Sequence, residues 1–385
     1  MSSTFKEVLQ TYSSSWILQT IQSSTPTQVE VALSRAARAQ RLTPEHFLAL
    51  LSPGAQPYIE EMAQISMRIT QQRFGKVIQM YVPLYLSNEC LCDCTYCGYS
   101  KVNQITRLTL NKDQILKECD FLCQQGFRHI LLLSGEDARY VNSRTLCETV
   151  QWIRPIFSSI SIEVQPMKVE EYARLVESGV DGVTVYQETY NQDAYQKVHL
   201  AGRKKVYDYR LETPERAATA GVRRINIGAL LGLSDWQYDG FCVGLHAWFL
   251  EKKYWRSQFS ISLPRIREAT GLAADYQGVS DPIFVQLMTA LRLFLPNIGI
   301  TLSTRETARF RDHVFPLGVT QMSAGSRTTP GGYIEENHSG AQFEVEDRRS
   351  PNEVVRMIQQ RGYEAVWKDW DPSFLGEPIP IEKSA

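Results

Sequence analysis

Eight short apolar runs, separated by amphipathic stretches, occupy the chain between residues 77 and 322 and restrict its possible folds more than any other feature. We expect strands at 77–85, 129–133, 160–165, 182–186, 224–230, 258–263, 298–302 and 319–322. The stretches between them predict helices near 111–125, 143–155, 169–178, 204–220, 236–256, 283–295 and 304–313. Strands that alternate with helices form parallel βα units, and eight such strands close a barrel. The predicted fold is therefore an α/β TIM-type (βα)8 barrel, with a doubly wound open sheet as the alternative.

The two flanks of this region show different patterns. Residues 1–75 lack a strand signal, and helices are expected near 27–40, 44–51 and 54–73, each after a Ser/Thr-Pro pair that suits a helix start. After about residue 325 the alternation stops, and one helix is expected near 354–361. We therefore predict a helical N-terminal extension (1–75), a barrel (76–325) and a C-terminal tail that packs on the barrel (326–385).

Charge and cysteine usage exclude several classes of partner. The chain has 41 basic and 42 acidic residues without a long run of one sign, so nucleic acid is not an expected partner. No apolar run reaches the roughly 18 to 20 residues that a spanning helix needs. The N-terminus does not resemble a signal peptide, and the cysteines are clustered rather than spread in pairs. A reducing, cytoplasmic location is expected.

Four of the eight cysteines lie within eight residues, directly after the first predicted strand. Cys90, Cys94 and Cys97 have the spacing C-x3-C-x2-C, which can hold a four-iron cube whose fourth iron has no protein ligand. Cys92 is then a bystander. The alternative is a closed zinc knuckle that uses all four thiolates.

This loop resembles that of the radical S-adenosylmethionine (SAM) superfamily in its spacing, in Tyr96 before the last cysteine, and in its place after the first strand. The resemblance implies a [4Fe–4S] cluster held by Cys90, Cys94 and Cys97, with Tyr96 beside the cofactor. It also implies that SAM binds the open iron through its amine and carboxylate, and that reductive cleavage yields a 5′-deoxyadenosyl radical.

Two further motifs are similar to those of the superfamily. Ser134-Gly135-Glu136 follows the second predicted strand and resembles a Gly-Gly-Glu motif, which implies that Glu136 accepts a hydrogen bond from the methionyl amine. Gly228 and Gly232 resemble a G-x-I-x-G-x-x-E motif that contacts adenine, and glycine allows close backbone approach. Taken alone, either pattern also serves ordinary turns.

Three of the charged residues between these motifs are candidates for cofactor binding. The resemblance implies that Glu188 and Arg210 approach the ribose and the methionyl carboxylate of SAM. A plain ion pair between these two side chains is the alternative. Glu163 is counted with the cofactor-binding residues, although it can face either the cofactor or the barrel lumen.

A third set of residues resembles the amino-acid clamp of the aromatic amino acid lyases in this superfamily. Arg305 follows the seventh predicted strand, Ser323 follows the eighth, and Tyr85 ends the first. A guanidinium at a barrel mouth suits a two-point grip on a carboxylate. The alternative is that Arg305 pairs with Glu306 or Asp312.

Resemblance over nearly the whole chain is to the 2-iminoacetate synthases, the tyrosine lyases of thiamine biosynthesis. It rests on segments 83–88, 163–166, 185–190, 302–306 and 367–371. The implied reaction splits the Cα–Cβ bond of L-tyrosine into 2-iminoacetate (dehydroglycine) and p-cresol. A flavodoxin- or ferredoxin-type reductant and a thiazole synthase are the implied protein partners.

Other functions stay open at this stage. The tyrosine lyases of hydrogenase maturation carry a second cluster on C-terminal cysteines, whereas the last cysteine here is Cys242. A tryptophan lyase is a further alternative, because the clamp reads only the amino-acid backbone. A zinc-stabilised binding module and a barrel that delivers its cluster to a partner are the alternatives from other classes.

Overall fold

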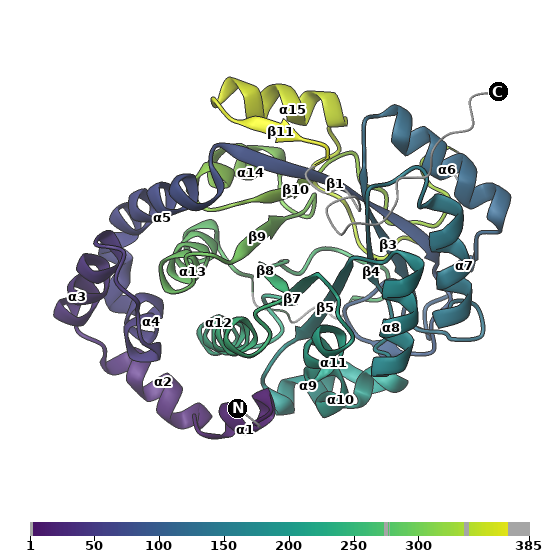
Figure 1. The fold of residues 1–385 in the computed structure, drawn as a ribbon. Helices are drawn as coiled ribbons and strands as arrows, with labels where there is room; N and C mark the ends of the chain where they lie inside the picture. Colours follow the sequence, from purple (N-terminus) through teal and green to yellow (C-terminus); the bar gives the residue numbers. More distant parts are fainter. Residues whose placement is uncertain (1–2, 273–275, 277, 335–338, 369–385) are drawn as a thin grey trace.

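The computed structural model describes residues 3–272, 276, 278–334 and 339–368, and a closed ring of parallel strands lies at its centre (Figure 1). The ring consists of β1 (Val77–Ser87), β3 (His129–Ser134), β4 (Ser159–Glu163), β5 (Gly182–Glu188), β7 (Arg224–Ala229), β8 (Gln258–Ser262), β9 (Gly299–Leu302) and β10 (Gln321–Ser323). Pairing between β10 and β1 closes it. The predicted eight-stranded barrel is confirmed, and the open sheet is wrong.

The register of β1 and β3 brings together the two loops that carry the first motifs. β3 is buried over its first five residues, as expected of a parallel strand covered on both faces. Tyr85 lies opposite Leu133, and Ser87 lies opposite Ser134. The Gly135 amide then donates to the Ser87 carbonyl oxygen at 2.9 Å. The cysteine loop after β1 and the Gly-Glu loop after β3 therefore share one end of the barrel.

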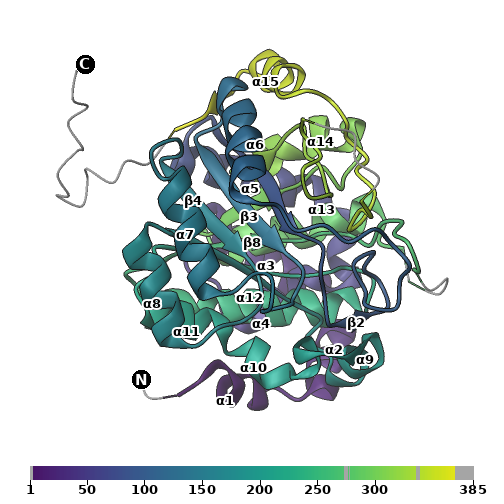
Figure 2. The same cartoon turned by 90° about the vertical axis from the view of Figure 1, so that its right-hand side faces the viewer.

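Helices surround the barrel, and Figure 2 shows three of them, α6, α7 and α8, outside β3 and β4. The outer helices are α6 (Lys112–Gln124), α7 (Ser143–Ile153), α8 (Val169–Ser178), α9 (Gln192–Val198), α10 (Tyr207–Leu211), α11 (Thr213–Thr219), α12 (Trp236–Lys253), α13 (Asp281–Phe294) and α14 (Ala308–Val314). The single helix predicted over 204–220 is wrong, because the chain forms a short 3-10 turn (Arg203–Lys205), α10 and α11 instead. Pro214 has no N–H to continue a helix and lies in the first turn of α11.

The N-terminal extension is helical, as predicted, and wraps one side of the barrel (Figure 1). It contains α1 (Phe5–Gln10), α2 (Ser14–Ser23), α3 (Pro26–Ala37), α4 (Pro44–Leu51), a 3-10 helix (Pro53–Tyr58) and α5 (Ile59–Phe74). Thr25 and Thr43 cap α3 and α4 through their side chains, each with proline at the first helical turn. These helices pack on α12 and α13. None of the described helices combines the length and apolarity that crossing a bilayer requires.

The described part of the C-terminal tail contacts the barrel. Helix α15 (Pro351–Gln360) covers the predicted 354–361 segment, and strand β11 (Glu364–Val366), which was not predicted, pairs in parallel with β1 outside the ring. The Trp367 ring meets the Phe127 ring edge-on, with 5.0 Å between centroids. Residues 369–371 of the predicted 367–371 motif lie outside the described residues.

A buried ion pair also fastens the tail. Asp347 pairs with Arg311 of α14, and both side chains are fully buried. Arg349 reaches both Asp347 and Asp312 at 2.8 Å. The tail is therefore joined to the barrel by charge as well as by apolar packing.

Candidate active site

The cysteine loop is held in place by a small second sheet and by close glycine contacts. Strand β2 (Asp93–Cys94) pairs with β6 (His199–Ala201) in antiparallel orientation. Gly135 lies so close to the loop that a Cβ there would stand 2.2 Å from the Glu89 carbonyl oxygen. A larger residue at this position would displace the loop, which explains the glycine of the Gly-Glu motif.

All four cysteines of the loop line one cavity at the carboxyl end of the barrel. The Cys90 Sγ accepts the backbone N–H groups of Cys92 and Glu136, each at 3.4 Å. Backbone donors of this kind stabilise cluster thiolates. Cys92 is buried and donates its S–H to Glu136 Oε2 at 3.6 Å. The loop therefore fits a sulfur-ligated cluster.

A single metal ion fits the loop less well. In the part of the chain that the structure describes, no three His, Cys, Asp or Glu side chains are arranged to hold one ion. A four-iron cube is wider than one ion and needs its thiolates further apart. The closed zinc knuckle, which requires all four sulfurs around one point, loses support.

Beside the cysteines lies a buried network of two acids and two bases. Arg210 donates to Glu136 Oε1 at 2.9 Å, and its other terminal nitrogen lies 3.6 Å from Glu188 Oε1. Lys204 donates to the same Glu188 oxygen at 2.7 Å. Burial by itself would raise the pKa of Glu188, but Lys204 and Arg210 hold it below its ordinary value. The ion pair between Glu188 and Arg210, given above as the alternative to SAM contacts, thus exists, and Lys204, which the sequence analysis missed, completes it.

Glu188 has an unusual backbone. Its φ is 70°, in the left-handed region that side chains rarely adopt, and the β5–β7 register shifts between Tyr186 and Glu188. This irregularity aims the carboxylate at Lys204 and Arg210 instead of along the strand.

Tyr96 lies on the same side of the cavity. Its hydroxyl and His199 Nε2 are 2.8 Å apart, and the Lys204 ammonium stands 5.6 Å from its ring centroid. Burial, followed by the charge of Lys204, lowers the pKa of His199 to about 3. His199 is therefore a neutral partner that orients the Tyr96 ring.

A second cavity adjoins the first and contains all three predicted clamp residues. Tyr85, Arg305 and Ser323 line it, and Tyr85 and Arg305 line the cysteine cavity too. Tyr85 donates to Gln342 Oε1 at 2.7 Å, and Ser323 Oγ accepts the Thr304 amide at 3.2 Å. Gln342 comes from the C-terminal tail, so the sequence analysis missed it.

The Arg305 guanidinium has no acidic partner among the described residues. Glu306 instead pairs with Arg265 and Arg267, and Asp312 pairs with Arg349. The Arg305 guanidinium carbon lies 3.3 Å from the Phe343 ring centroid, so it stacks on that ring. Burial lowers the pKa of Arg305. The alternative that Arg305 serves a local ion pair is wrong.

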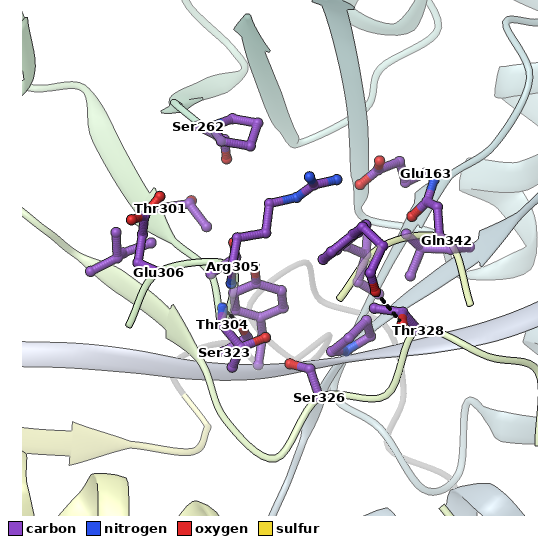
Figure 3. Close-up of a pocket in the computed structure, with 18 of the residues that line it drawn as sticks. Glu163, Ser262, Thr301, Thr304, Arg305, Glu306, Ser323, Ser326, Thr328 and Gln342 are labelled. Carbon is purple, nitrogen blue, oxygen red and sulfur yellow. Dashed lines mark hydrogen bonds between the residues drawn. The ribbon is translucent and has the colours of Figure 1, made fainter. Parts of the chain in front are cut away.

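Glu163 lines both cavities, so it faces the barrel lumen and the cysteine cavity alike. Figure 3 shows its carboxylate opposite the Arg305 guanidinium. No hydrogen bond or ion pair joins its carboxylate to another described side chain. Burial, followed by the charge of Glu188, raises the pKa of Glu163 to about 7, against the opposing effects of Arg305, Lys204 and Arg210.

The two predicted adenine-contact glycines do not line either cavity, although Leu230 between them lines the cysteine cavity. A Cβ on Gly228 would stand 2.4 Å from the Ser262 carbonyl oxygen. Gly232 has a φ of 110°, so it turns the chain after β7. Local backbone structure therefore explains why both positions are glycine.

Comparison with known proteins agrees with this geometry. Residues 84–242 match the Radical SAM superfamily, and residues 262–364 match the Biotin and Thiamin Synthesis associated domain. The barrel, its cysteine loop and these matches define a radical SAM enzyme, and the superfamily implies a [4Fe–4S] cluster and SAM as cofactors.

The chain is 45% identical to the 2-iminoacetate synthase of Salmonella typhimurium (strain LT2) over 89% of its own length and 91% of that protein. It is 44% identical to the 2-iminoacetate synthase of Escherichia coli (strain K12), over the same shares of the two chains. The chain belongs to the 2-iminoacetate synthase family.

Solved structures show the same fold. A crystal structure of HydG, a maturase of the [FeFe]-hydrogenase, is similar with a TM-score of 0.88 and 30% identity, over 95% of this chain and 84% of that one. Methylornithine synthase (PylB) is similar in fold alone, with a TM-score of 0.70 and 20% identity, over 87% of this chain and 97% of that one.

Proposed function

We propose that this radical SAM enzyme cleaves the Cα–Cβ bond of L-tyrosine. Tyrosine, SAM, two electrons and one proton give 2-iminoacetate, p-cresol, 5′-deoxyadenosine and methionine. One observation carries the proposal. Arg305 and Glu163 have opposite charges and line the same two cavities beside the cysteine loop, but they do not contact each other.

Arg305 and Glu163 suit the two ends of an amino-acid zwitterion. The guanidinium would hold the substrate carboxylate at two points, while Phe343 keeps its plane fixed. Glu163 would accept the substrate ammonium and can take one proton from it. The amine would then lie at the boundary with the cysteine cavity, since Glu163 lines both spaces. Tyr85 and Ser323 complete the clamp.

We also propose roles for the residues of the cysteine cavity. Cys90, Cys94 and Cys97 would ligate the cluster, with Cys92 outside the ligand set. Glu136, Glu188, Arg210 and Lys204 would position the amine, ribose and carboxylate of SAM, with Tyr96 packing beside them. When bound, these cofactors supply the radical that removes a hydrogen atom from the substrate amine.

We also propose that the chain divides into an N-terminal extension (1–75), a barrel (76–325) and a C-terminal tail (326–385). These bounds are compatible with barrel strands that begin at Val77 and end at Ser323. A flavodoxin- or ferredoxin-type protein would supply the electrons, and a thiazole synthase would consume 2-iminoacetate. Family membership supports both partners without identifying them.

One experiment tests the proposed activity. The protein is reconstituted anaerobically with iron and sulfide and then incubated with reductant, SAM and L-tyrosine. We expect p-cresol and 5′-deoxyadenosine, with little product when L-tryptophan replaces tyrosine. Cofactor cleavage without p-cresol would reject the tyrosine assignment, and cleavage of tryptophan instead would identify a different aromatic amino acid lyase.

A further inference from the structure

The interior of this barrel below the clamp is lined by small polar side chains, unlike that of an ordinary eight-stranded barrel. Such barrels are usually filled by layers of bulky branched side chains. Here the residues that line a lower lumen of about 40 Å³ include Ser159, Ser161, Gly182, Thr184, Asn226 and Ser260, beside the larger Tyr81, Tyr186 and Arg224. The small residues leave the lower lumen partly unfilled.

The lower lumen adjoins a cavity above it and another below it. It shares Tyr81, Leu131, Tyr186 and Thr301 with the clamp cavity. It shares Arg224, Ser260 and Gln321 with a basal cavity of about 820 Å³. The basal cavity lies at the amino ends of the strands and is lined by residues of α12, α13 and the N-terminal extension. The three cavities therefore lie one after another between the clamp and the opposite face, separated only by the side chains that they share.

The lower end of this series carries positive charge. The Arg224 guanidinium donates to Gln79 Oε1 at 2.8 Å and has no acidic partner among the described residues. Arg41 and Lys252 line the basal cavity, where Glu251 is the acidic residue of the lining. A small anion that leaves the clamp is thus drawn toward the base.

An unpaired polar atom also points to a ligand in the lumen. Asn226 donates from Nδ2 to Ser262 Oγ at 2.9 Å, whereas its buried Oδ1 has no hydrogen-bond partner in the described structure. A buried acceptor without a donor is costly unless something fills that role. A molecule with an N–H group in the lumen would satisfy Asn226.

We propose that the smaller product, 2-iminoacetate, leaves through the barrel to the basal cavity, an inference that rests on the proposed function. Its carboxylate suits Arg224, and its imine N–H suits Asn226 Oδ1. The apolar ring of p-cresol suits neither, so the two products would separate at the boundary formed by Tyr81 and Tyr186. Water adds to the free imine and expels ammonia to give glyoxylate, so a confined path limits this loss before the next enzyme acts.

The first test measures access and needs no catalysis. Ser161→Cys places a thiol in the lumen of the full-length protein, which is treated with the small anionic reagent 2-sulfonatoethyl methanethiosulfonate and analysed by peptide mass spectrometry. We expect labelling of the introduced thiol, and at least a roughly tenfold slower reaction when Ser260→Phe blocks the basal side. Ser66→Cys, at a buried position of α5 that lines none of these cavities, is the matched control and should stay unlabelled.

The second test follows the two products separately. Total p-cresol is measured after acid quench, and free glyoxylate is read continuously with added lactate dehydrogenase and NADH. Ser260→Phe should leave first-turnover p-cresol unchanged and delay glyoxylate roughly tenfold. The milder Ser260→Leu gives the same comparison if the larger side chain prevents folding.

Two results would overturn the channel: a Ser161→Cys protein whose new thiol stays unlabelled, or glyoxylate that still appears together with p-cresol in both Ser260 variants. Absence of p-cresol from the wild-type protein would instead reject the proposed function, while the labelling test would still decide whether the passage is open.

Discussion

The Arg305 guanidinium faces the Glu163 carboxylate across a shared cavity wall, and no ion pair joins them (Figure 3). Two half-buried opposite charges that stay apart are costly, because neither is neutralised by its surroundings. A zwitterionic amino acid placed between them would neutralise both at once. Under the proposed function, this relationship would favour free amino acids over other carboxylates.

Arg305→Lys should impair tyrosine turnover far more than it impairs cofactor cleavage without substrate. An ammonium cannot reproduce the planar two-point grip, so kcat/KM for tyrosine should fall by about 10- to 100-fold. Parallel measurement of p-cresol and 5′-deoxyadenosine checks this. Arg139→Lys, at an exposed arginine paired with Asp137, is the control and should behave as wild type. Equal loss of both products in Arg305→Lys would assign Arg305 to the fold or the cofactor.

Glu163 should make tyrosine capture dependent on pH. Its pKa is about 7, and only the carboxylate attracts the substrate ammonium. As pH falls below about 7, Glu163 becomes protonated, so kcat/KM should fall by about tenfold per unit. Glu163→Gln should lower kcat/KM and remove this limb of the pH profile.

Glu170→Gln, an exposed change on α8, should retain the wild-type profile. A Glu163→Gln variant with the same acid limb as wild type would show that another group titrates.

The three predicted cluster ligands should differ from Cys92 in one assay. Alanine at Cys90, Cys94 or Cys97 should prevent retention of iron and sulfide and abolish 5′-deoxyadenosine formation. Cys92→Ala should retain the cluster, because its S–H contact is with Glu136 and can be lost without exposing an iron. Loss of the cluster in Cys92→Ala would instead show that the choice of three thiolates is incorrect.

Asp347→Asn should destabilise the protein. Removing one partner of a buried ion pair leaves the Arg311 charge uncompensated, at a cost of about 3 to 5 kcal/mol. Chemical denaturation of the two proteins measures the difference. Burial alone would raise the pKa of Asp347, but Arg349 and Arg311 hold it below its ordinary value. This contribution is therefore complete above the unfolded pKa and is lost as pH falls through the folded one.

Glu353→Gln, at an exposed carboxylate of the same tail, should change stability much less. A similar loss in both variants would argue against a special role for the buried pair.

The barrel could be predicted because each of its strands is a separate apolar run, and a helical stretch lies between each strand and the next. The 204–220 segment shows the limit of that approach, since its amphipathic pattern continues across Pro214 while the chain does not. Strand β11 was missed because three residues with intermediate or high exposure give no periodic signal.

Some of the site residues could likewise be predicted from the sequence, and others could not. Cys90, Glu136 and Arg305 stand next to strand ends, so their convergence follows from the topology. Lys204 lies in a run of basic residues that resembles solvated surface, and Gln342 comes from the tail, 257 positions after Tyr85. Only the folded chain brings these residues to the cavities. The pairing of Glu306 and Asp312 with other arginines was likewise invisible in the sequence.

The left-handed backbone of Glu188 has an evolutionary consequence. A non-glycine residue in that conformation costs on the order of 1 to 3 kcal/mol, which glycine would largely avoid. Replacing Glu188 by glycine would relieve that strain but would leave the buried Lys204 ammonium without its carboxylate, at a cost of about 3 to 5 kcal/mol. A library of this enzyme ranked only by melting temperature should therefore keep an acidic residue at position 188 in spite of its backbone.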